Sequence, residues 1–252
     1  MENLSITTTN ENIKVKYESS QSESYLEMKN GDRKKIKSSA IKLTQGATLI
    51  LGTNPKYTLK LTTINGNIKI KEFIGHELEI ETVTGEVTLH NIITPKIYAR
   101  TKTGVITLAS AITENCYHTT PTGIISVIDL QTIRSTMNSA GCGDISLNNT
   151  LVTEQLSMMS TNGNIYGENI REQKINTWSA KGNIIIEELT SDNINTETIN
   201  GKTFLEINGT KDDYQEIICY GKNSEPKPIY LRKKLIKAKA GNNGRITISY
   251  TK

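Results

Sequence analysis

The chain has few of the residues that build compact, covalently stapled domains. Only 5% of its 252 residues are aromatic and 35% are hydrophobic. The three cysteines, Cys116, Cys142 and Cys219, are too few and too widely spaced for a disulfide framework, and no Cys/His spacing predicts a zinc site. We therefore expect three free thiols, buried or half-buried, in a reducing compartment.

Signals for export or membrane insertion are also missing. The start, Met1 to Thr9, has neither a basic segment nor an apolar one, and no apolar run approaches the ~18 residues that cross a bilayer. As it stands, the sequence predicts a cytoplasmic protein without a transmembrane segment, and a trimmed piece of a longer chain would fit the cell envelope instead. The net charge of +4 is modest, so we expect no specific nucleic-acid partner.

Catalytic patterns are equally scarce. No glycine-rich stretch matches a phosphate-binding or dinucleotide-binding loop, so we expect no cofactor. Three histidines lack a Ser/Asp arrangement and are interpreted as surface or turn residues: His76, His90 and His118. Four carboxylates could line a cleft: Glu79, Glu81, Glu86 and Asp144. A glycosidic site needs acids at a defined separation, and β-helical enzymes build it with long inserted loops that this chain lacks. We expect no enzyme activity and no metal site.

What the chain does have is a repeat. Eight glycines follow one another in steps of 19 or 20 residues: Gly66, Gly85, Gly104, Gly123, Gly143, Gly163, Gly182 and Gly201. Each has Ser, Thr or Ala three residues before it, and nearly all have aliphatic residues two and four residues after it. A fixed short period indicates a repeat array.

Alternation within each unit predicts strands with one buried face. The residues two and four after the glycines should be buried, and in the middle units these are Ile106, Leu108, Ile125, Val127, Ile145 and Leu147. The small Ser/Thr column should form a hydroxyl ladder at a tight corner. A third apolar point follows seven or eight residues after the glycine: Ile74, Ile93, Ile112, Leu130, Leu151, Ile170 and Leu189.

Two all-β architectures fit this pattern. In a β-solenoid, each unit is a coil of 19–20 residues whose strands pair in parallel with those of the next coil. In a meander or barrel, each unit is a hairpin, and Asn65-Gly66 is a good hairpin turn by itself. The solenoid is favoured because Thr often precedes the glycine, and Thr tolerates the left-handed conformation of such a turn badly.

The units divide one continuous domain into three parts. Residues 1–45 are expected to be N-terminal capping strands, with 12–17 and 25–32 forming a hairpin, because an open solenoid end would expose strand edges. Residues 46–210 are the solenoid repeats, and residues 211–252 are the C-terminal coils and cap.

One face should carry an interaction site. The outward positions six and four residues before the glycines hold Tyr98, Arg100, Tyr117, Met137, Met159 and Trp178. Exposed aromatic groups of this kind mark interfaces, so a protein or glycan partner is expected there, unless a terminal extension covers the face. The basic segment Lys222 to Lys239 is interpreted as a solvated edge that guards against strand pairing, with an anionic partner as the alternative.

The unit Ser/Thr-x-x-Gly-x-Ile-x-Leu resembles that of the bacterial adhesin-type family of β-solenoid domains found among cell-envelope stress-response proteins. The resemblance covers residues 46–210 and returns at 244–248. It implies a right-handed β-solenoid and a non-catalytic binding or structural scaffold, with no catalytic residues to carry over. Bactofilins, cytoplasmic solenoids that polymerise, are a second resemblance in architecture, so self-association is an alternative, and a polysaccharide-active enzyme is a weaker one.

Overall fold

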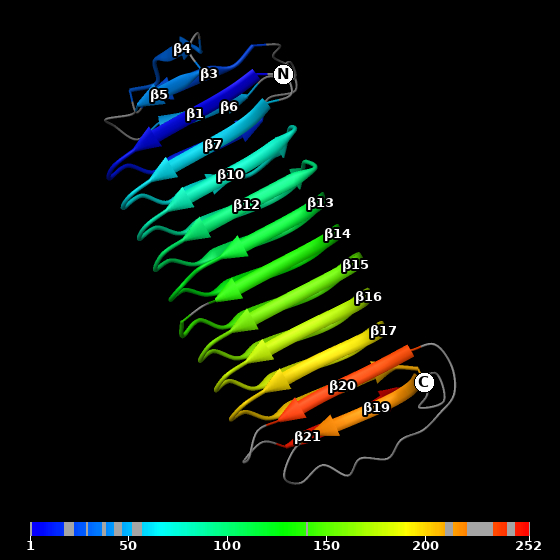
Figure 1. Ribbon diagram of the computed structural model, residues 1–252. Coiled ribbons are helices and arrows are strands. Elements are labelled where there is room, and N and C mark those ends of the chain that lie inside the picture. Colours follow the sequence, from blue (N-terminus) through cyan, green and yellow to red (C-terminus); the bar gives the residue numbers. More distant parts are fainter. Residues whose placement is uncertain are drawn as a thin grey trace.

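The computed structural model describes residues 2–17, 23–28, 30–36, 39–42, 47–51, 57–139, 141–209, 214–220, 234–240 and 245–251. These residues form strands and turns and contain no helix. The strands stack into a right-handed β-solenoid with about 8 turns of ~19 residues (Figure 1). The fold predicted from the glycine period is confirmed.

The strands fall into three groups. The N-terminal rows contain β1 (Glu2–Thr8), β2 (Ile13–Tyr17), β3 (Tyr25–Met28), β4 (Arg33–Lys35), β5 (Ala40–Lys42), β6 (Ala47–Leu51), β7 (Tyr57–Thr63), β8 (Ile68–Ile70) and β9 (Phe73–Ile74). The middle coils contain β10 (Glu77–Thr82), β11 (Val87–Ile93), β12 (Lys96–Thr101), β13 (Ile106–Thr119), β14 (Ile125–Ser139), β15 (Ile145–Ser160), β16 (Ile165–Ser179) and β17 (Ile184–Thr198). The C-terminal rows contain β18 (Thr203–Asn208), β19 (Tyr214–Tyr220), β20 (Lys234–Ala240) and β21 (Ile246–Thr251).

Neighbouring coils pair in parallel and in register. Ile106 of β13 lies beside Ile125 of β14, which lies beside Ile145 of β15. Like residues therefore stack along the solenoid axis, which is why the sequence repeats with the length of a coil. The hairpin alternative is wrong for these units.

Each coil has three faces, as β12 and β13 illustrate. The first face is the strand before the glycine, Lys96–Thr101, and the second face follows the glycine, from Ile106 to Ala109. Ser110 then adopts a positive φ of 57°, and this left-handed corner leads to a short third face. A third corner returns the chain to the first face of the next coil.

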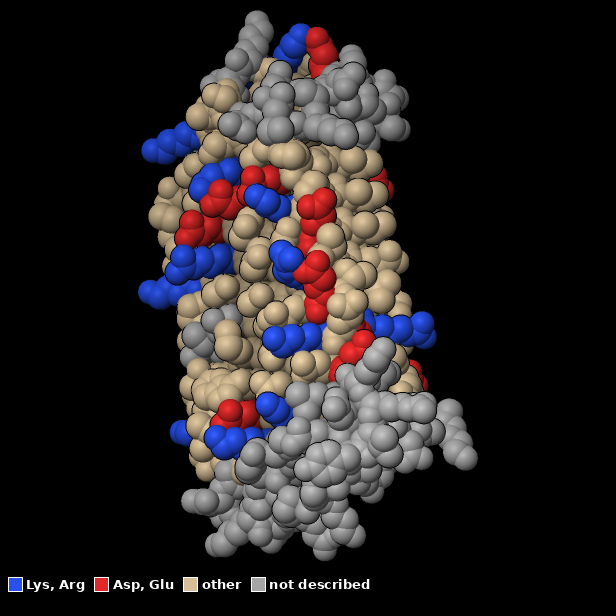
Figure 2. Space-filling view, turned by 45° about the vertical axis from the view of Figure 1, so that its right-hand side comes forward, with Lys and Arg blue, Asp and Glu red and all other residues tan. Residues whose placement is uncertain are grey.

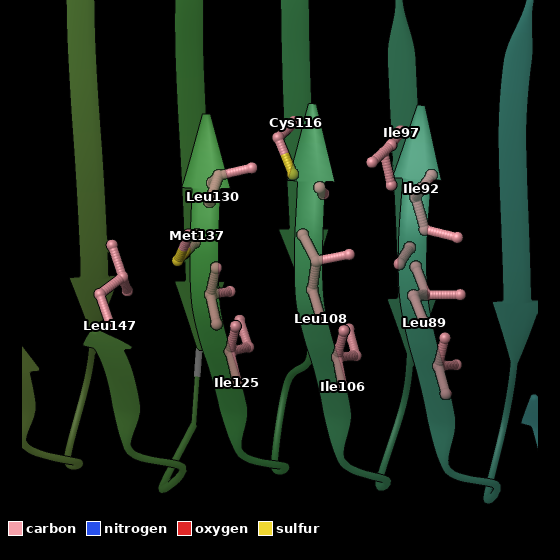
Figure 3. Close-up of a cluster of buried hydrophobic side chains, with 14 of the residues drawn as sticks. Leu89, Ile92, Ile97, Ile106, Leu108, Cys116, Ile125, Leu130, Met137 and Leu147 are labelled. Carbon is pink, nitrogen blue, oxygen red and sulfur yellow. The ribbon is translucent and has the colours of Figure 1, made fainter. Parts of the chain in front are cut away.

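The interior is filled by the predicted columns (Figure 3). All six mid-stack core residues that the sequence predicts, from Ile106 to Leu147, are at most 1% exposed. The third apolar point needs a correction, because only the seventh position after the glycine is buried, as Leu130 shows. At the eighth position Ile74, Ile93 and Ile112 are about half exposed, since each follows a buried neighbour on a strand whose side chains alternate.

The glycine corner leaves no room for a side chain. A Cβ on Gly104 would lie well under 3.0 Å from the carbonyl oxygen of Gly85 in the preceding coil. Gly85 stands in the same relation to Gly66, and Gly123 to Gly104. These glycines do not have positive φ angles. They are needed because successive coils approach one another closely, which imposes the period.

The Ser/Thr column bonds to the backbone rather than forming the expected ladder of hydroxyls. The Thr101 hydroxyl accepts a hydrogen bond from the Gly104 N–H at 3.1 Å and donates one to the Gly85 carbonyl at 3.1 Å. Ser179 makes the same pair of bonds, to Gly182 and Gly163. Each hydroxyl therefore joins two consecutive coils at the tightest point of the stack.

Both ends of the solenoid depart from sequential order. β1 lies between β5 and β7, so the outermost N-terminal row is made by a later segment. β20 likewise lies between β17 and β19. The predicted hairpin of residues 12–17 and 25–32 is wrong: β2 pairs in parallel with β6 and β8, while β3 pairs antiparallel with β4 and β6. Residues 2–17 thus belong to the stack, not to a separate cap.

Candidate functional site

Two tyrosines stack on the first face. Tyr98 of β12 and Tyr117 of β13 are direct neighbours in the register, and their ring centroids lie 4.9 Å apart with an interplanar angle of 7°. This distance matches the spacing of ~4.8 Å between strands, so the backbone itself holds the rings in contact. Tyr98 is 37% exposed. We call the outward side of β7, β10, β12 and the first-face parts of β13–β17 the tyrosine face.

A hollow of about 480 Å³ surrounds this pair. It is lined by Glu77, Glu79, Ile80, Glu81, Tyr98, Ala99, Arg100, Tyr117 and Thr119. Glu79, which pairs with Tyr98 in the register, is much shorter than a tyrosine, so the stack of rings ends at Tyr98. The hollow therefore combines an aromatic edge with carboxylates and a guanidinium.

The charges around the hollow are only partly paired. Glu79 forms an ion pair with Lys60, with 2.6 Å between the Glu79 Oε1 and the Lys60 Nζ. Arg100 lies beside Glu81 in the register but makes no ion pair with any described residue. Its guanidinium is thus free to bind an external acceptor.

The predicted outward position of Met137 was wrong. It was expected beside Tyr117 on the outside, but it is wholly buried in the hydrophobic interior (Figure 3). In the register it lies between His118 and Met158. The corner before Gly143 contains one additional residue, because Ser139 and Ile145 are six apart where Thr120 and Ile125 are five apart. Counting back from Gly143 therefore selects an inward position, and Thr136 occupies the outward one.

Met159 and Trp178 form a second cluster on the tyrosine face. They are neighbours in the register, with Met159 39% exposed and Trp178 half-buried. They share a column with Arg100, Thr119 and Asn138. Thr136 and Ser157 lie between this pair and the tyrosines in the neighbouring column. The structure thus places five of the six predicted site residues on one face, in two groups.

The sequence-based prediction was also wrong for one of the three histidines. His76 and His90 are exposed as expected, but His118 is fully buried, and its Nε2 lies 3.6 Å from the Cys116 sulfur. Burial lowers the pKa of His118 to about 4 and raises the pKa of the Cys116 thiol. Both groups are therefore neutral parts of the core. Cys142 is exposed, contrary to expectation.

The remaining sequence candidates do not come together. Glu79 and Glu81 lie on the tyrosine face, whereas Glu86 and Asp144 follow the glycine corner on the second face. Within the described ranges, no three His, Cys, Asp or Glu side chains are grouped as a metal site, and no helix has the length and apolar character to span a bilayer. Of the basic segment, Lys222 and Lys227–Lys233 lie outside the described residues, and Lys239 pairs with Glu197 at 2.7 Å.

Surface charge is mixed on the view shown in Figure 2, where basic and acidic side chains alternate along the stack. The sequence did not indicate the acidic lining as a binding feature: Glu79 and Glu81 were interpreted only as catalytic candidates, and Glu77 was not among the candidates. Listing outward residues coil by coil would have placed them next to Tyr98. No protein-family model, curated protein or solved structure matches this chain.

Proposed function

We propose that this protein is a non-catalytic binding scaffold, of the adhesin-like kind, that binds a glycan at the hollow beside Tyr98. The observation that carries the proposal is the stacked pair of Tyr98 and Tyr117 next to Arg100, which has no ion-pair partner among the described residues. A flat, rigid face supports it because groups already held in place lose little conformational entropy on binding.

The chemistry of the hollow favours a glycan over a protein. Protein hot spots are fully desolvated apolar pockets filled by an aromatic or arginine anchor. This hollow is shallow and lined by carboxylates, a guanidinium and a tyrosine edge. Carboxylates accept hydrogen bonds from sugar hydroxyls, the guanidinium donates to them, and the aromatic ring packs against the apolar side of a sugar ring.

The proposal includes no chemical step. Glu79 is neutralised by Lys60, and the three glutamates of β10 lie on one strand rather than on opposite sides of a cleft. A hydrolytic mechanism needs a proton donor and a second carboxylate on either side of the scissile bond.

The test is a glycan array followed by calorimetry, with wild type, Tyr98→Ala and Tyr166→Ala. Tyr166 is the matched control because it is a 39% exposed tyrosine on the second face. We expect wild type and Tyr166→Ala to bind the same glycan, and Tyr98→Ala to bind at least about tenfold more weakly. Arg100→Ala should weaken binding as well.

Two outcomes would contradict this assignment. Equal binding by wild type and Tyr98→Ala would exclude the hollow. A second contradiction would be that no glycan binds, while wild type captures a protein that Tyr98→Ala and Trp178→Ala do not. The binding-scaffold function would then stand, with a protein as the partner in place of a glycan. Release of sugar fragments by wild type would overturn the non-catalytic assignment.

A further inference from the structure

The second face carries a gradient of charge along the solenoid axis. Its outward column consists of Lys16 and of the residues five after the glycines, and reads, from the N-terminal to the C-terminal rows, Lys16, Lys71, His90, Ala109, Ile128, Asn148, Glu168, Glu187 and, after a register shift, Glu206. The backbone N–H of Lys71 donates to the Val15 carbonyl, which places Lys71 beside Lys16. We call this series the lysine–glutamate column. It is basic at one end, apolar in the middle and acidic at the other end.

Within one copy, this arrangement is unfavourable. Glu168 and Glu187 are direct neighbours in the register, and so are Lys14 and Lys69 in the adjacent column. Like charges placed opposite one another in a sheet are destabilising. None of Lys14, Lys16, Lys69, Lys71 and Glu187 makes an ion pair with a described residue. Their charges are therefore available to a partner of opposite sign.

The middle of the face is apolar at the same time. Four other coils carry Asn or Asp directly after the glycine, namely Asn67, Asp144, Asn164 and Asn183. These side chains accept a hydrogen bond from a backbone N–H of the next coil, as Asn67 does from the Glu86 N–H at 2.8 Å. The two central coils have Val105 and Ile124 at this position. Ile124 and Ile128 are 46% and 42% exposed. An exposed apolar centre between charged ends has the organisation of an interface.

We infer that the second face binds a second copy of this chain, with the two solenoid axes antiparallel. The two-fold axis lies in the interface, along the strands and between the rows of Ala109 and Ile128. This operation places Lys71 against Glu168 of the other copy, and Lys16 against its Glu187. It also places Ala109 against Ile128 and Val105 against Ile124. Each contact occurs twice because the interface is isologous.

The neighbouring columns add one favourable and one unfavourable contact in the same register. In the column of Lys14 and Lys69, the symmetry operation brings Lys69 against Tyr166 of the other copy, where an ammonium can lie over the aromatic ring. It also opposes the carboxylates of Glu86 and Asp144, a repulsive pair at the margin next to the glycine corner, where Asp144 accepts a hydrogen bond from the Asn164 N–H at 2.6 Å. A parallel arrangement with the two-fold axis along the lysine–glutamate column would instead oppose Lys with Lys and Glu with Glu.

The area of the second face indicates how stable the dimer can be. Eight rows at ~4.8 Å and five residues at ~3.3 Å give a face of roughly 34 Å by roughly 13 Å, or about 450 Å² per copy. This is below the ~800 Å² per partner of stable complexes, so we expect a weak dimer that depends on salt. Dimerisation leaves the tyrosine face of each copy open, so this inference does not depend on the proposed glycan site.

Analytical ultracentrifugation of the full chain from about 5 to about 500 µM tests the inference. We expect wild type to dimerise at about 20 mM NaCl and to dissociate at about 500 mM. Lys16→Glu/Lys71→Glu makes both ends of the column acidic, and Glu168→Lys/Glu187→Lys makes both ends basic. Each double variant alone should dimerise at least about 100-fold more weakly than wild type.

Mixing the two double variants is the decisive experiment. Lys and Glu oppose one another at all four positions of the antiparallel dimer only between unlike copies, in two of them with the charges exchanged. A heterodimer should therefore form from two chains that are monomers alone. The matched control is Lys102→Glu/Lys181→Glu, which changes the net charge equally at exposed residues of the glycine corner. It should dimerise like wild type.

A wild type that stays monomeric at all concentrations would overturn the inference. Dimerisation of Lys16→Glu/Lys71→Glu with the same affinity as wild type would also overturn it. So would a mixture of the two double variants that stays monomeric. Circular dichroism of each variant confirms that the solenoid is intact, which we expect because all substituted side chains are exposed.

Discussion

The glycine corner and the left-handed corner lie on either side of the second face of each coil, and they turn the chain by different means. At the glycine corner the backbone keeps ordinary φ angles, but successive coils touch so closely that a Cβ cannot fit. At the left-handed corner there is room for side chains, and one residue per coil takes a positive φ: Asn91, Ser110, Asp129, Asn149, Asn169 and Glu188. One corner is limited by contact between coils, the other by the local conformation.

This difference explains which corner is visible in the sequence. Contact with the preceding coil admits only glycine, so the same letter returns in the eight repeats from Gly66 to Gly201. A left-handed residue costs an ordinary L-amino acid roughly 1–2 kcal/mol, and Asn, Asp and Gly reduce that cost. Several residue types are therefore accepted at the second corner, and no single letter marks it. The glycine corner should also be far less tolerant of substitution.

The largest effect is expected for Gly104→Ala. The added Cβ would collide with the Gly85 carbonyl, a backbone group that cannot move without separating two coils. We expect a loss of more than about 4 kcal/mol of unfolding free energy, or failure to fold, measured by chemical denaturation followed by circular dichroism.

Gly167→Ala is the matched control for that substitution. A Cβ there would lie 3.0 Å from the Ile170 Cδ1, the end of a flexible side chain, in a column that is aliphatic in other coils. We expect a change of less than about 1.5 kcal/mol. Equal losses for the two variants would show that close contact between coils is not what requires glycine.

Ile125→Ala removes a buried side chain from the second face, between the two corners. Ile125 is fully buried and stacks between Ile106 and Ile145. The cavity should cost roughly 2–5 kcal/mol in chemical denaturation. Ile112→Ala, at a side chain that is 53% exposed, should cost far less. A loss under about 0.5 kcal/mol for Ile125→Ala would contradict the assignment of the core columns.

The same reasoning shows how far the sequence predicts the structure. The glycines locate the second face well, because only a few residues separate each glycine from Ile106 or Ile125 and the spacing there is constant. Prediction failed for Met137 and His118. Met137 was counted back across a corner that contains one additional residue. His118 was judged by its polarity, although its position, between Ala99 and Met137 in the register, is an inward one.

The candidate site was predictable only in part. The outward positions of Tyr98, Arg100 and Tyr117 follow from alternation on one strand. The hollow depends on how side chains of different length stack in successive coils, which the spacing of one motif does not describe. The lysine–glutamate column was missed for a related reason, because its residues are unlike one another and form a pattern only when the coils are aligned.

Glu172→Gln tests the third corner. In this column the adjacent coils have Val152 and Ser191, and earlier coils have Thr113 and Thr132, whose hydroxyls donate to corner carbonyls. The pKa of Glu172 is raised to about 8, mainly by burial, with the Ser191 hydroxyl lowering it and the nearby Asp192 raising it. Because the folded-state pKa is raised, the stability contributed by the protonated carboxyl is fully present below about pH 4.5 and is lost as pH rises through about 8.

The variant should therefore be more stable than wild type by roughly 2–4 kcal/mol at pH 8.5 and similar to it at pH 4.5, in denaturation curves recorded across this range. His118 provides an internal reference. Its pKa is lowered to about 4, so its contribution is present above pH 6.5 and is lost as pH falls through about 4. That acid-side loss should be the same in both proteins. Equal stability at pH 8.5 would contradict a protonated Glu172.

Thr101→Val examines the hydrogen bonds of the glycine corner without changing its shape. The substitution leaves the Gly104 N–H and the Gly85 carbonyl without their partner in a buried corner. We expect a loss of about 1–3 kcal/mol in chemical denaturation. Thr103→Val is the control, because its hydroxyl bonds the Val83 carbonyl on the exposed side of the same corner. A similar loss of unfolding free energy in both variants would show that burial of the Thr101 hydrogen bonds does not increase their contribution to stability.

The smallest effect is expected at the left-handed corner, and it should be a gain. Glu188 has a φ of 52°, whereas the preceding coils hold Asn149 and Asn169, which are joined by a side-chain hydrogen bond of 2.9 Å. Glu188→Asn substitutes a residue that accepts this conformation and can extend the bond to Asn169. Stability should rise by about 0.5–1 kcal/mol. Asn169→Ala should lower it by a similar amount, since alanine has neither property. Thermal denaturation of both variants beside wild type measures the difference, and a loss of stability in Glu188→Asn would show that local conformation does not govern this corner.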